Sequence, residues 1–333
     1  MLFLFIGGKM QKNVVTIAVL ILFCSCILSG CATDTTVFKD DNRYHIVCTT
    51  FPQYDWVANL ICGNEENVSL TLLMDKGGDL HNFQPSVLDI ARVSKCDMFI
   101  YVGGESDSWV KDALKEAVNP DMRVINMMEV IGERLVEEEH VDRSSEHDEQ
   151  EHEEQEYDEH VWLSIKNAAF IVEEITTELI SMDNRNVDLY QRNCDRYTAA
   201  LRALDLQFAK AIENAKKDML LFADRFPFRY FVEDYGLNYY AAFNGCSAET
   251  EASFGTVAFL INKLEELELD FVIVLDGSDD RLAQVIIENT QSGQQQVCVL
   301  NSMQSVSRKE VKEGVHYLNI MEENLNMIRK LLG

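Results

Sequence analysis

Short apolar runs recur along the chain and alternate with longer segments in which apolar residues return every three or four positions. In the first half, four such runs cover residues 44–50, 68–74, 97–102 and 122–126. Four more follow in the second half, at residues 218–223, 237–243, 270–276 and 296–301. Strands that alternate with amphipathic helices predict βαβ units and parallel sheets covered on both faces. We therefore expect an α/β protein of two tandem lobes, each with a four-stranded parallel sheet flanked by helices.

A long helical pattern separates the two sets of strands. Residues 166–217 contain neither Pro nor Gly, and their apolar residues recur at helical spacing. The polar residues 183–186 predict a break and an N-cap. A helix over residues 187–217 would then be roughly 45 Å long at ~1.5 Å per residue, stiff enough to hold the lobes in a fixed relation. A coiled-coil dimer is the alternative, which the short and irregular heptad pattern disfavours.

The N-terminus is typical of an export signal and not of a fold element. Lys12 precedes an apolar run over residues 14–28, which is shorter than the ~20 residues of a membrane-spanning helix. The following Leu-Ser-Gly-Cys resembles a bacterial lipobox, in which Cys31 is lipidated and becomes the first mature residue. A retained transmembrane anchor is the alternative. The predicted organisation is a signal at 1–31, a tether at 32–43, an N-terminal lobe at 44–182, a linking helix at 183–217 and a C-terminal lobe at 218–333.

The charge of the chain favours cations as partners. Lys and Arg number 29 against 56 Asp and Glu, a net charge of -27, which argues against nucleic-acid binding because phosphate contacts need a basic face. Residues 137–159 alone hold thirteen acids, one Arg, and His140, His147 and His152. This composition predicts a solvated, disordered loop. Imidazoles among carboxylates suit zinc, so we expect the loop to collect metal; a solubilising insert is the alternative.

Two loops carry candidate metal ligands. Ligands of open α/β sheets bind beyond the carboxyl ends of strands. The loop over residues 75–83 follows the second predicted strand and presents His81 after a glycine pair that lets the backbone fold tightly. His160 follows the acidic segment directly. Two histidines in such loops predict a metal site in a cleft between the lobes.

These motifs resemble the cluster A-I substrate-binding lipoproteins of zinc and manganese ABC importers. The resemblance covers nearly the whole mature chain and is carried by residues 78–86 (GDLHNFQPS), 101–104 (YVGG), 160–164 (HVWLS), 228–231 (FRYF), 234–237 (DYGL), 314–317 (GVHY) and 321–325 (MEENL). It implies a receptor that binds zinc with high affinity and delivers it to the membrane permease of an ABC importer. A His-rich acidic insert before the second ligand implies zinc over manganese. We expect a monomer, anchored by lipid to the outer face of the bacterial cell membrane.

Two positions depart from that family's ligand pattern. The third ligand, usually His or Glu, falls at Arg225, and the fourth, usually Asp or Glu, falls at Gln304. An arginine cannot ligate a metal because its guanidinium stays protonated and offers only donors. The adjacent Asp224 would supply the missing carboxylate; otherwise it forms a salt bridge with Arg225 or caps a helix. The predicted ligands are thus His81, His160, Asp224 and Gln304, with Glu249, Asp276 and Asp279 in neighbouring loops as alternatives.

Competing functions are a zinc hydrolase and an adhesin. Two histidines, one carboxylate and an open position would be catalytic-type ligation. The sequence contains no HExxH and no GxSxG motif, and Glu159 is the only acid beside His160 that would act as a general base. An adhesin would only display a surface, whereas the matched lobes and paired histidines favour a ligand cleft. We therefore expect a transport protein with zinc as its cargo and no enzymatic activity.

Overall fold

The computed structural model describes residues 37–38, 42–138, 156–243 and 252–333. The chain divides into two units, Met1–Asp41 and Asn42–Gly333, and the fold is that of the second. The predicted signal with Cys31 and the predicted loop histidines His140, His147 and His152 lie outside the described residues. Across the described ranges, no helix combines the length and apolar character needed to cross a membrane.

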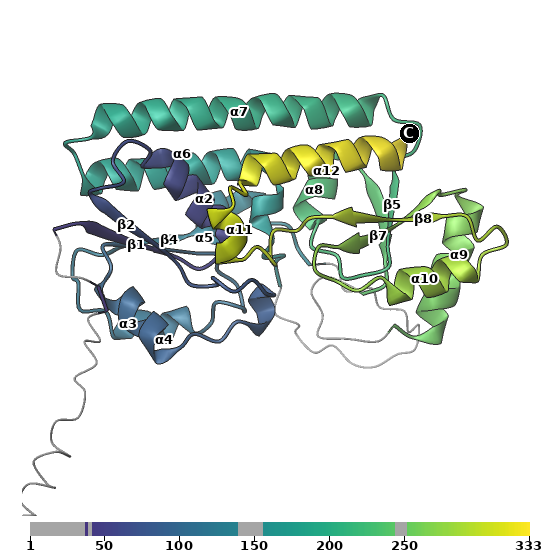
Figure 1. The fold of residues 1–333 in the computed structure, drawn as a ribbon, viewed down its shortest axis with the longest axis horizontal. Coiled ribbons are helices and arrows are strands. Elements are labelled where there is room, and N and C mark those ends of the chain that lie inside the picture. The colour runs from purple at the N-terminus through teal and green to yellow at the C-terminus, as the bar shows by residue number, and fades with distance from the viewer. Residues whose placement is uncertain (1–36, 39–41, 139–155, 244–251) are drawn as a thin grey trace, which may run out of the picture. The chain divides into compact units, whose positions relative to one another are not determined.

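The first lobe is built on a parallel sheet with the strand order β2-β1-β3-β4 (Figure 1). Its strands are β1 (Tyr44–Cys48), β2 (Val68–Leu72), β3 (Met98–Tyr101) and β4 (Arg123–Asn126). Its helices are α2 (Phe51–Leu60), α3 (Val87–Lys95), α4 (Val110–Lys115) and α5 (Met127–Ile131). The central strands β1 and β3 are buried on both faces, which explains the continuous apolar sequence of β3 and of the last three residues of β1.

The second lobe repeats this topology with the order β6-β5-β7-β8. Its strands are β5 (Met219–Phe222), β6 (Asn238–Ala241), β7 (Phe271–Leu275) and β8 (Gln296–Leu300). Its helices are α8 (Arg229–Tyr235), α9 (Phe254–Glu266), α10 (Arg281–Glu288), α11 (Arg308–Lys312) and α12 (Tyr317–Leu332). The predicted fold class is confirmed, and all eight predicted strands are present.

Two long helices join the lobes. α6 (Ile165–Met182) is followed by a break and then by α7 (Val187–Glu213), which begins where the sequence predicts and ends short of residue 217. Asp183 shapes the break: its buried carboxylate accepts hydrogen bonds from Asn186 Nδ2 at 2.7 Å and Tyr190 Oη at 3.1 Å. α7 packs against α6, α2 and α12 and runs along both lobes (Figure 1).

The larger of two hydrophobic clusters among the described residues contains side chains of both lobes, which supports the expectation of a fixed relation between them. Trp56 of the first lobe packs edge-on against Tyr317 of the second, with ring centroids 5.3 Å apart. The buried carboxylate of Asp55 accepts hydrogen bonds from the Tyr317 backbone N–H at 3.1 Å and from Tyr197 Oη at 3.3 Å. Opening the lobes would expose these groups to water. A wide hinge motion would therefore carry a large free-energy cost.

Candidate metal centre

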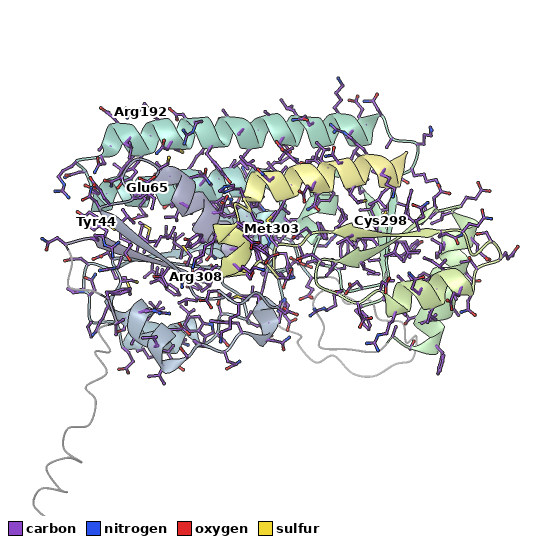
Figure 2. The ribbon with its side chains drawn as sticks, in the orientation of Figure 1. Tyr44, Glu65, Arg192, Cys298, Met303 and Arg308 are labelled. Atoms are coloured by element: carbon purple, nitrogen blue, oxygen red, sulfur yellow. The ribbon has the colours of Figure 1, made fainter. Side chains whose placement is uncertain are left out.

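His81 lies in a loop that the second lobe holds in place. The loop follows β2, and Gly77 within it has a φ of 71°; a methyl group there would overlap the Ser305 carbonyl. The segment after β8, which carries Met303 and Arg308 (Figure 2), reaches the same loop: the Arg308 N–H donates to the Asp75 carbonyl at 2.7 Å. A single 3₁₀ turn, η1 (Leu80–Asn82), then presents His81. The glycine is therefore needed for close approach as well as for its backbone conformation.

His160 begins a second short turn, η3 (Val161–Leu163), and is almost fully buried. Its backbone N–H donates to Asp158 Oδ1 at 2.8 Å. Tyr230 of the second lobe donates its hydroxyl hydrogen to the Asp158 carbonyl at 2.8 Å, and Trp162 Nε1 donates to the Ser302 carbonyl at 2.9 Å. Both lobes therefore fix the position of this histidine.

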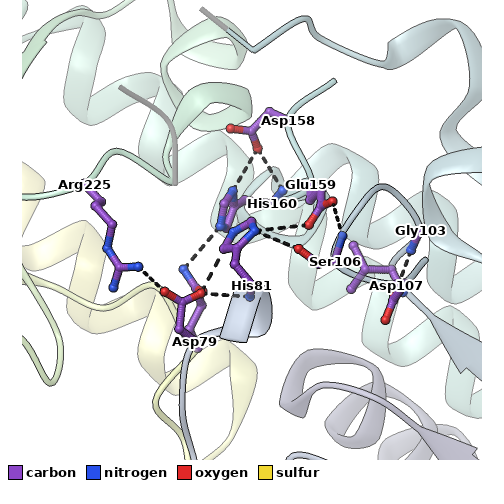
Figure 3. Close-up of polar contacts among 11 residues, drawn as sticks. Asp79, His81, Gly103, Ser106, Asp107, Asp158, Glu159, His160 and Arg225 are labelled. Carbon is purple, nitrogen blue, oxygen red and sulfur yellow. Dashed lines mark hydrogen bonds and ion pairs between the residues drawn. The ribbon is translucent and has the colours of Figure 1, made fainter. Parts of the chain in front are cut away.

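The two imidazoles face each other with ring centroids 5.4 Å apart (Figure 3). Their Nδ1 atoms point to polar partners: His160 Nδ1 lies 3.1 Å from Asp158 Oδ1, and His81 Nδ1 lies 2.7 Å from Ser106 Oγ. A carboxylate on Nδ1 favours the tautomer that leaves a lone pair on Nε2. This leaves His160 Nε2 available to a metal. At His81 the Ser106 hydroxyl, which can donate or accept, occupies Nδ1, so Nε2 is the nitrogen without a hydrogen bond among the described residues.

The Nε2 side of the histidines holds two further polar groups. Gln304 Nε2 lies 3.2 Å from His160 Nε2, and Asp79 Oδ1 lies 4.0 Å from His81 Nε2. His81 Nε2 and Gln304 Oε1 are buried and have no hydrogen-bond partner within the described residues. Burial and the neighbouring His160 lower the pKa of His81 to about 4. The His81 imidazole is therefore neutral at neutral pH, which is the form that ligates metal.

The Glu159 carboxylate lies on the Nδ1 side of His81. Its Oε1 accepts the Ser106 backbone N–H at 2.9 Å, and its Oε2 lies 3.6 Å from His81 Nδ1. A methyl group at Gly104 would overlap this carboxylate, so the glycine makes room for it. Burial raises the pKa of Glu159. Ser106 thus contacts both His81, through its hydroxyl, and Glu159, through its backbone.

The Asp224 carboxylate is bonded to backbone N–H groups of the second lobe. Its Oδ1 accepts the Arg225 backbone N–H at 2.8 Å, and its Oδ2 accepts the Leu275 backbone N–H at 2.9 Å. It also lines a pocket of the second lobe with Ser278 and Asp279. Ligation by Asp224 would compete with these two hydrogen bonds, and it stays a prediction.

The alternative carboxylates are also engaged or lie outside the described residues. Asp276 accepts hydrogen bonds from the Ser302 backbone at 2.5 Å and hydroxyl at 2.9 Å, and Asp279 pairs with Arg281 at 2.7 Å. Glu249 is outside the described residues. In the described part of the chain, no group of three or more His, Cys, Asp or Glu side chains is arranged so that it could hold a metal ion without a change in side-chain positions.

Three residues near the histidines were not predicted as site residues: Asp79, Ser106 and Glu159. The Arg225 guanidinium pairs with Asp79, across the two lobes (Figure 3), and the Asp224 carboxylate accepts the Arg225 backbone N–H. A sequence signal existed for Asp79, because an acid two residues before His81 is typical of a capped turn. Glu159 precedes His160 directly. Nothing in the sequence pattern indicates Ser106.

Comparison with known proteins identifies relatives that are named for zinc binding or zinc uptake. The zinc-binding protein AdcA of Streptococcus pyogenes serotype M3 is 25% identical over 296 residues, which cover 87% of this chain and 56% of the relative. The chain thus spans little more than half the length of such relatives. The high-affinity zinc uptake system protein ZnuA of Bacillus subtilis is 26% identical over 312 residues, 93% of this chain and 95% of the relative.

Solved structures support the same fold. The Zn(II)-bound ZnuA-like domain of Streptococcus pneumoniae AdcA matches with a TM-score of 0.68 and 23% identity, covering 87% of this chain and 99% of that domain. The metal-dependent lipoprotein YcdH of Bacillus subtilis matches with a TM-score of 0.71 and 23% identity, covering 87% and 100%. The family model for the periplasmic component A of zinc-uptake complexes matches residues 46–331. The chain therefore belongs to this family, whose members are substrate-binding proteins of transport systems and not enzymes.

Proposed function

We propose that this protein is an extracytoplasmic receptor that binds zinc between its lobes and delivers it to the membrane permease of an ABC importer. The observation that carries the proposal is the pair His81 and His160, which face each other with their Nδ1 atoms held by Ser106 and Asp158. The orientation of both rings is therefore supported by contacts within the protein. Such preorganisation lowers the entropic cost of binding.

Zinc is the proposed cargo in preference to manganese. Imidazole nitrogen suits zinc, whereas manganese favours carboxylate, carbonyl and water oxygens. The relatives ZnuA and AdcA are named for zinc uptake or zinc binding. The proposed location is the outer face of the cell membrane, with the mature chain attached through lipidated Cys31.

The acidic segment is proposed to gather zinc for this site. Glu138 N–H donates to the Glu156 carbonyl at 3.0 Å, and Asp158 N–H donates to the Val136 carbonyl at 3.0 Å. These contacts join the two ends of the segment, whose last residue, Glu159, directly precedes His160. Ions held by the segment's histidines and acids would therefore be released close to the site, where the negative charge raises the local cation concentration.

Zinc titration of the mature chain tests this function. A calorimetric titration against a competing chelator should find one tight zinc site, and manganese should bind it more weakly. His81→Ala and His160→Ala should each weaken zinc binding at least tenfold, or ~1.4 kcal/mol. His316→Gln is the matched control, because this imidazole pairs with Asp55 at 2.9 Å away from the site. Tight binding that survives both alanine substitutions would refute the proposed site.

A further inference from the structure

The ion pair between Asp79 and Arg225 joins the two lobes at the histidine site. Asp79 precedes the turn that carries His81, and Arg225 belongs to the loop after β5. The Arg225 guanidinium pairs with Asp79 Oδ2, and the side chains are 31% and 12% exposed. The other carboxylate oxygen, Oδ1, accepts the His81 backbone N–H at 3.0 Å and lies 4.0 Å from His81 Nε2. One carboxylate thus contacts both a fixed cation and the ligand side of His81.

We propose that Asp79 is the carboxylate ligand of the metal and that Arg225 is a resident cation which the metal displaces from it. This inference rests on the proposed function of the site. It assigns a role to Arg225, which occupies the position where the resembling family usually has a metal-ligating His or Glu. In the metal-free protein Arg225 compensates the charge of Asp79, and in the metal-bound protein the metal does so.

The distances suit this assignment. Zinc bonds to His nitrogen and carboxylate oxygen are ~2.0–2.1 Å long, so two ligand atoms of a tetrahedral zinc lie about 3.4 Å apart. Asp79 Oδ1 and His81 Nε2, at 4.0 Å, need to approach by a fraction of an ångström. The 3.2 Å between Gln304 Nε2 and His160 Nε2 is already close to that separation once the amide is turned to present its oxygen. Two histidines, Asp79 and Gln304 would then complete four ligands.

The charges of Arg225 and the metal explain why one would replace the other at the Asp79 carboxylate. A guanidinium cannot ligate, and its charge opposes a divalent cation held on the same carboxylate. Arg225 is about one-third exposed, so its long side chain can turn toward water when the metal arrives. Asp79 is largely buried and would be destabilised if left without any cation. Exchange of one cation for another keeps this carboxylate compensated in both states.

The loop itself does not need to move when Arg225 leaves. Gly78 N–H donates to the Gln304 carbonyl at 3.2 Å, and Lys76 forms an antiparallel bridge with Ser307. These backbone contacts hold the loop against the second lobe independently of the ion pair. The exchange therefore replaces the ion pair on Asp79, while the backbone contacts keep the loop that carries His81 in place.

Zinc affinity of four variants tests the exchange. The full mature chain is titrated with zinc against a chelator, as parent, Asp79→Asn, Arg225→Gln, Arg225→Lys and the double variant. Asp79→Asn should weaken binding at least tenfold. Arg225→Gln should tighten it at least threefold because the competing cation is gone, and Arg225→Lys should stay near the parent. The double variant should match Asp79→Asn, since Arg225 acts through Asp79. Asp112→Asn and Arg281→Gln, both in exposed ion pairs, are the controls.

A second measurement needs no substitution of the site. The side-chain ¹⁵N resonance of Arg225, assigned with the Arg225→Lys variant, should change on addition of one equivalent of zinc, as the guanidinium leaves Asp79. An unchanged resonance, or weaker zinc binding by Arg225→Gln, would overturn the exchange and leave Arg225 as a residue that positions Asp79. Unchanged binding by Asp79→Asn would remove Asp79 from the ligands. If His81→Ala and His160→Ala also bind like the parent, the proposed function fails as well; if they lose binding, only this inference fails.

Discussion

The ring centroids of His81 and His160 lie 5.4 Å apart, and the Nδ1 atom of each imidazole contacts a polar side chain, Ser106 for His81 and Asp158 for His160. The two histidines come from loops far apart in the sequence. Ser106 and Asp158 contact the Nδ1 atoms, while the Nε2 atoms lie near Asp79 and Gln304. The orientation of both imidazole rings is therefore set by contacts at their Nδ1 atoms.

The first prediction concerns Ser106. Its hydroxyl contacts His81 Nδ1 at 2.7 Å, and partners of this kind fix ring orientation and commonly contribute 10–100-fold in metal affinity. Ser106→Ala should therefore weaken zinc binding about tenfold in a competition titration, with little change in thermal stability. The exposed neighbour Ser108 offers the control Ser108→Ala. Equal affinities for the two variants would mean that the hydroxyl does not position His81.

The second prediction separates a ligand role of Asp224 from a structural one. Its carboxylate accepts two backbone N–H groups, at 2.8 and 2.9 Å, and loss of charged buried hydrogen bonds costs ~1–3 kcal/mol each. Asp224→Ala should lower the free energy of unfolding in urea by this order while zinc affinity is kept. A variant of parental stability that has lost zinc affinity would return Asp224 to the ligand set.

The third prediction concerns the acidic segment. Residues 138 and 156 are joined by a backbone hydrogen bond of 3.0 Å, so residues 139–155 can be replaced by a short glycine turn without separating the ends. The variant should keep its melting temperature and the tight zinc site and lose the weaker sites. Zinc uptake by the parent should slow with added salt, because the Debye length falls from ~10 Å at 0.1 M to ~3 Å at 1 M. Loss of the tight site, or retention of every weak one, would contradict a metal-gathering role.

The fourth prediction is a pH dependence of stability that arises at Asp107. Burial raises the pKa of this carboxyl from 3.8 to about 6, with Glu159 adding repulsion. The folded protein therefore binds the proton more tightly than the unfolded chain, and this group lowers the free energy of unfolding as pH rises from 4 through 6. Over this pH range the free energy of unfolding falls by at most about 3 kcal/mol because of this group.

Asp107→Asn isolates this contribution. An amide oxygen can still accept the Val102 and Gly103 N–H groups, which bond Asp107 Oδ2 at 2.8 and 3.1 Å. Urea unfolding of the zinc-free variant at pH 5 and pH 7.5 should show a smaller difference in the free energy of unfolding than in the parent. Identical pH profiles would show that Asp107 titrates normally in the folded protein.

The elements of the fold were predictable because each has a characteristic pattern of apolar residues along the chain. Strands buried on both faces read as apolar runs, as in β3 (Met98–Tyr101), and helices repeat every three to four residues, as in α7 (Val187–Glu213). His81 and His160 were predictable because ligands of parallel sheets gather at strand ends. These are statements about neighbours along the chain, and the sequence by itself determined them.

Only the tertiary structure decided which side chains meet around the histidines. Asp224 and Arg225 are adjacent in sequence, yet the Asp224 carboxylate bonds the Leu275 backbone while the Arg225 guanidinium pairs with Asp79 of the other lobe. Ser106 meets His81 only because two loops of the first lobe pack together. The direction of a loop side chain depends on the backbone conformation of its turn and on packing between distant segments. Neither leaves a periodic trace in the sequence, because the interactions that set them join residues far apart in the chain.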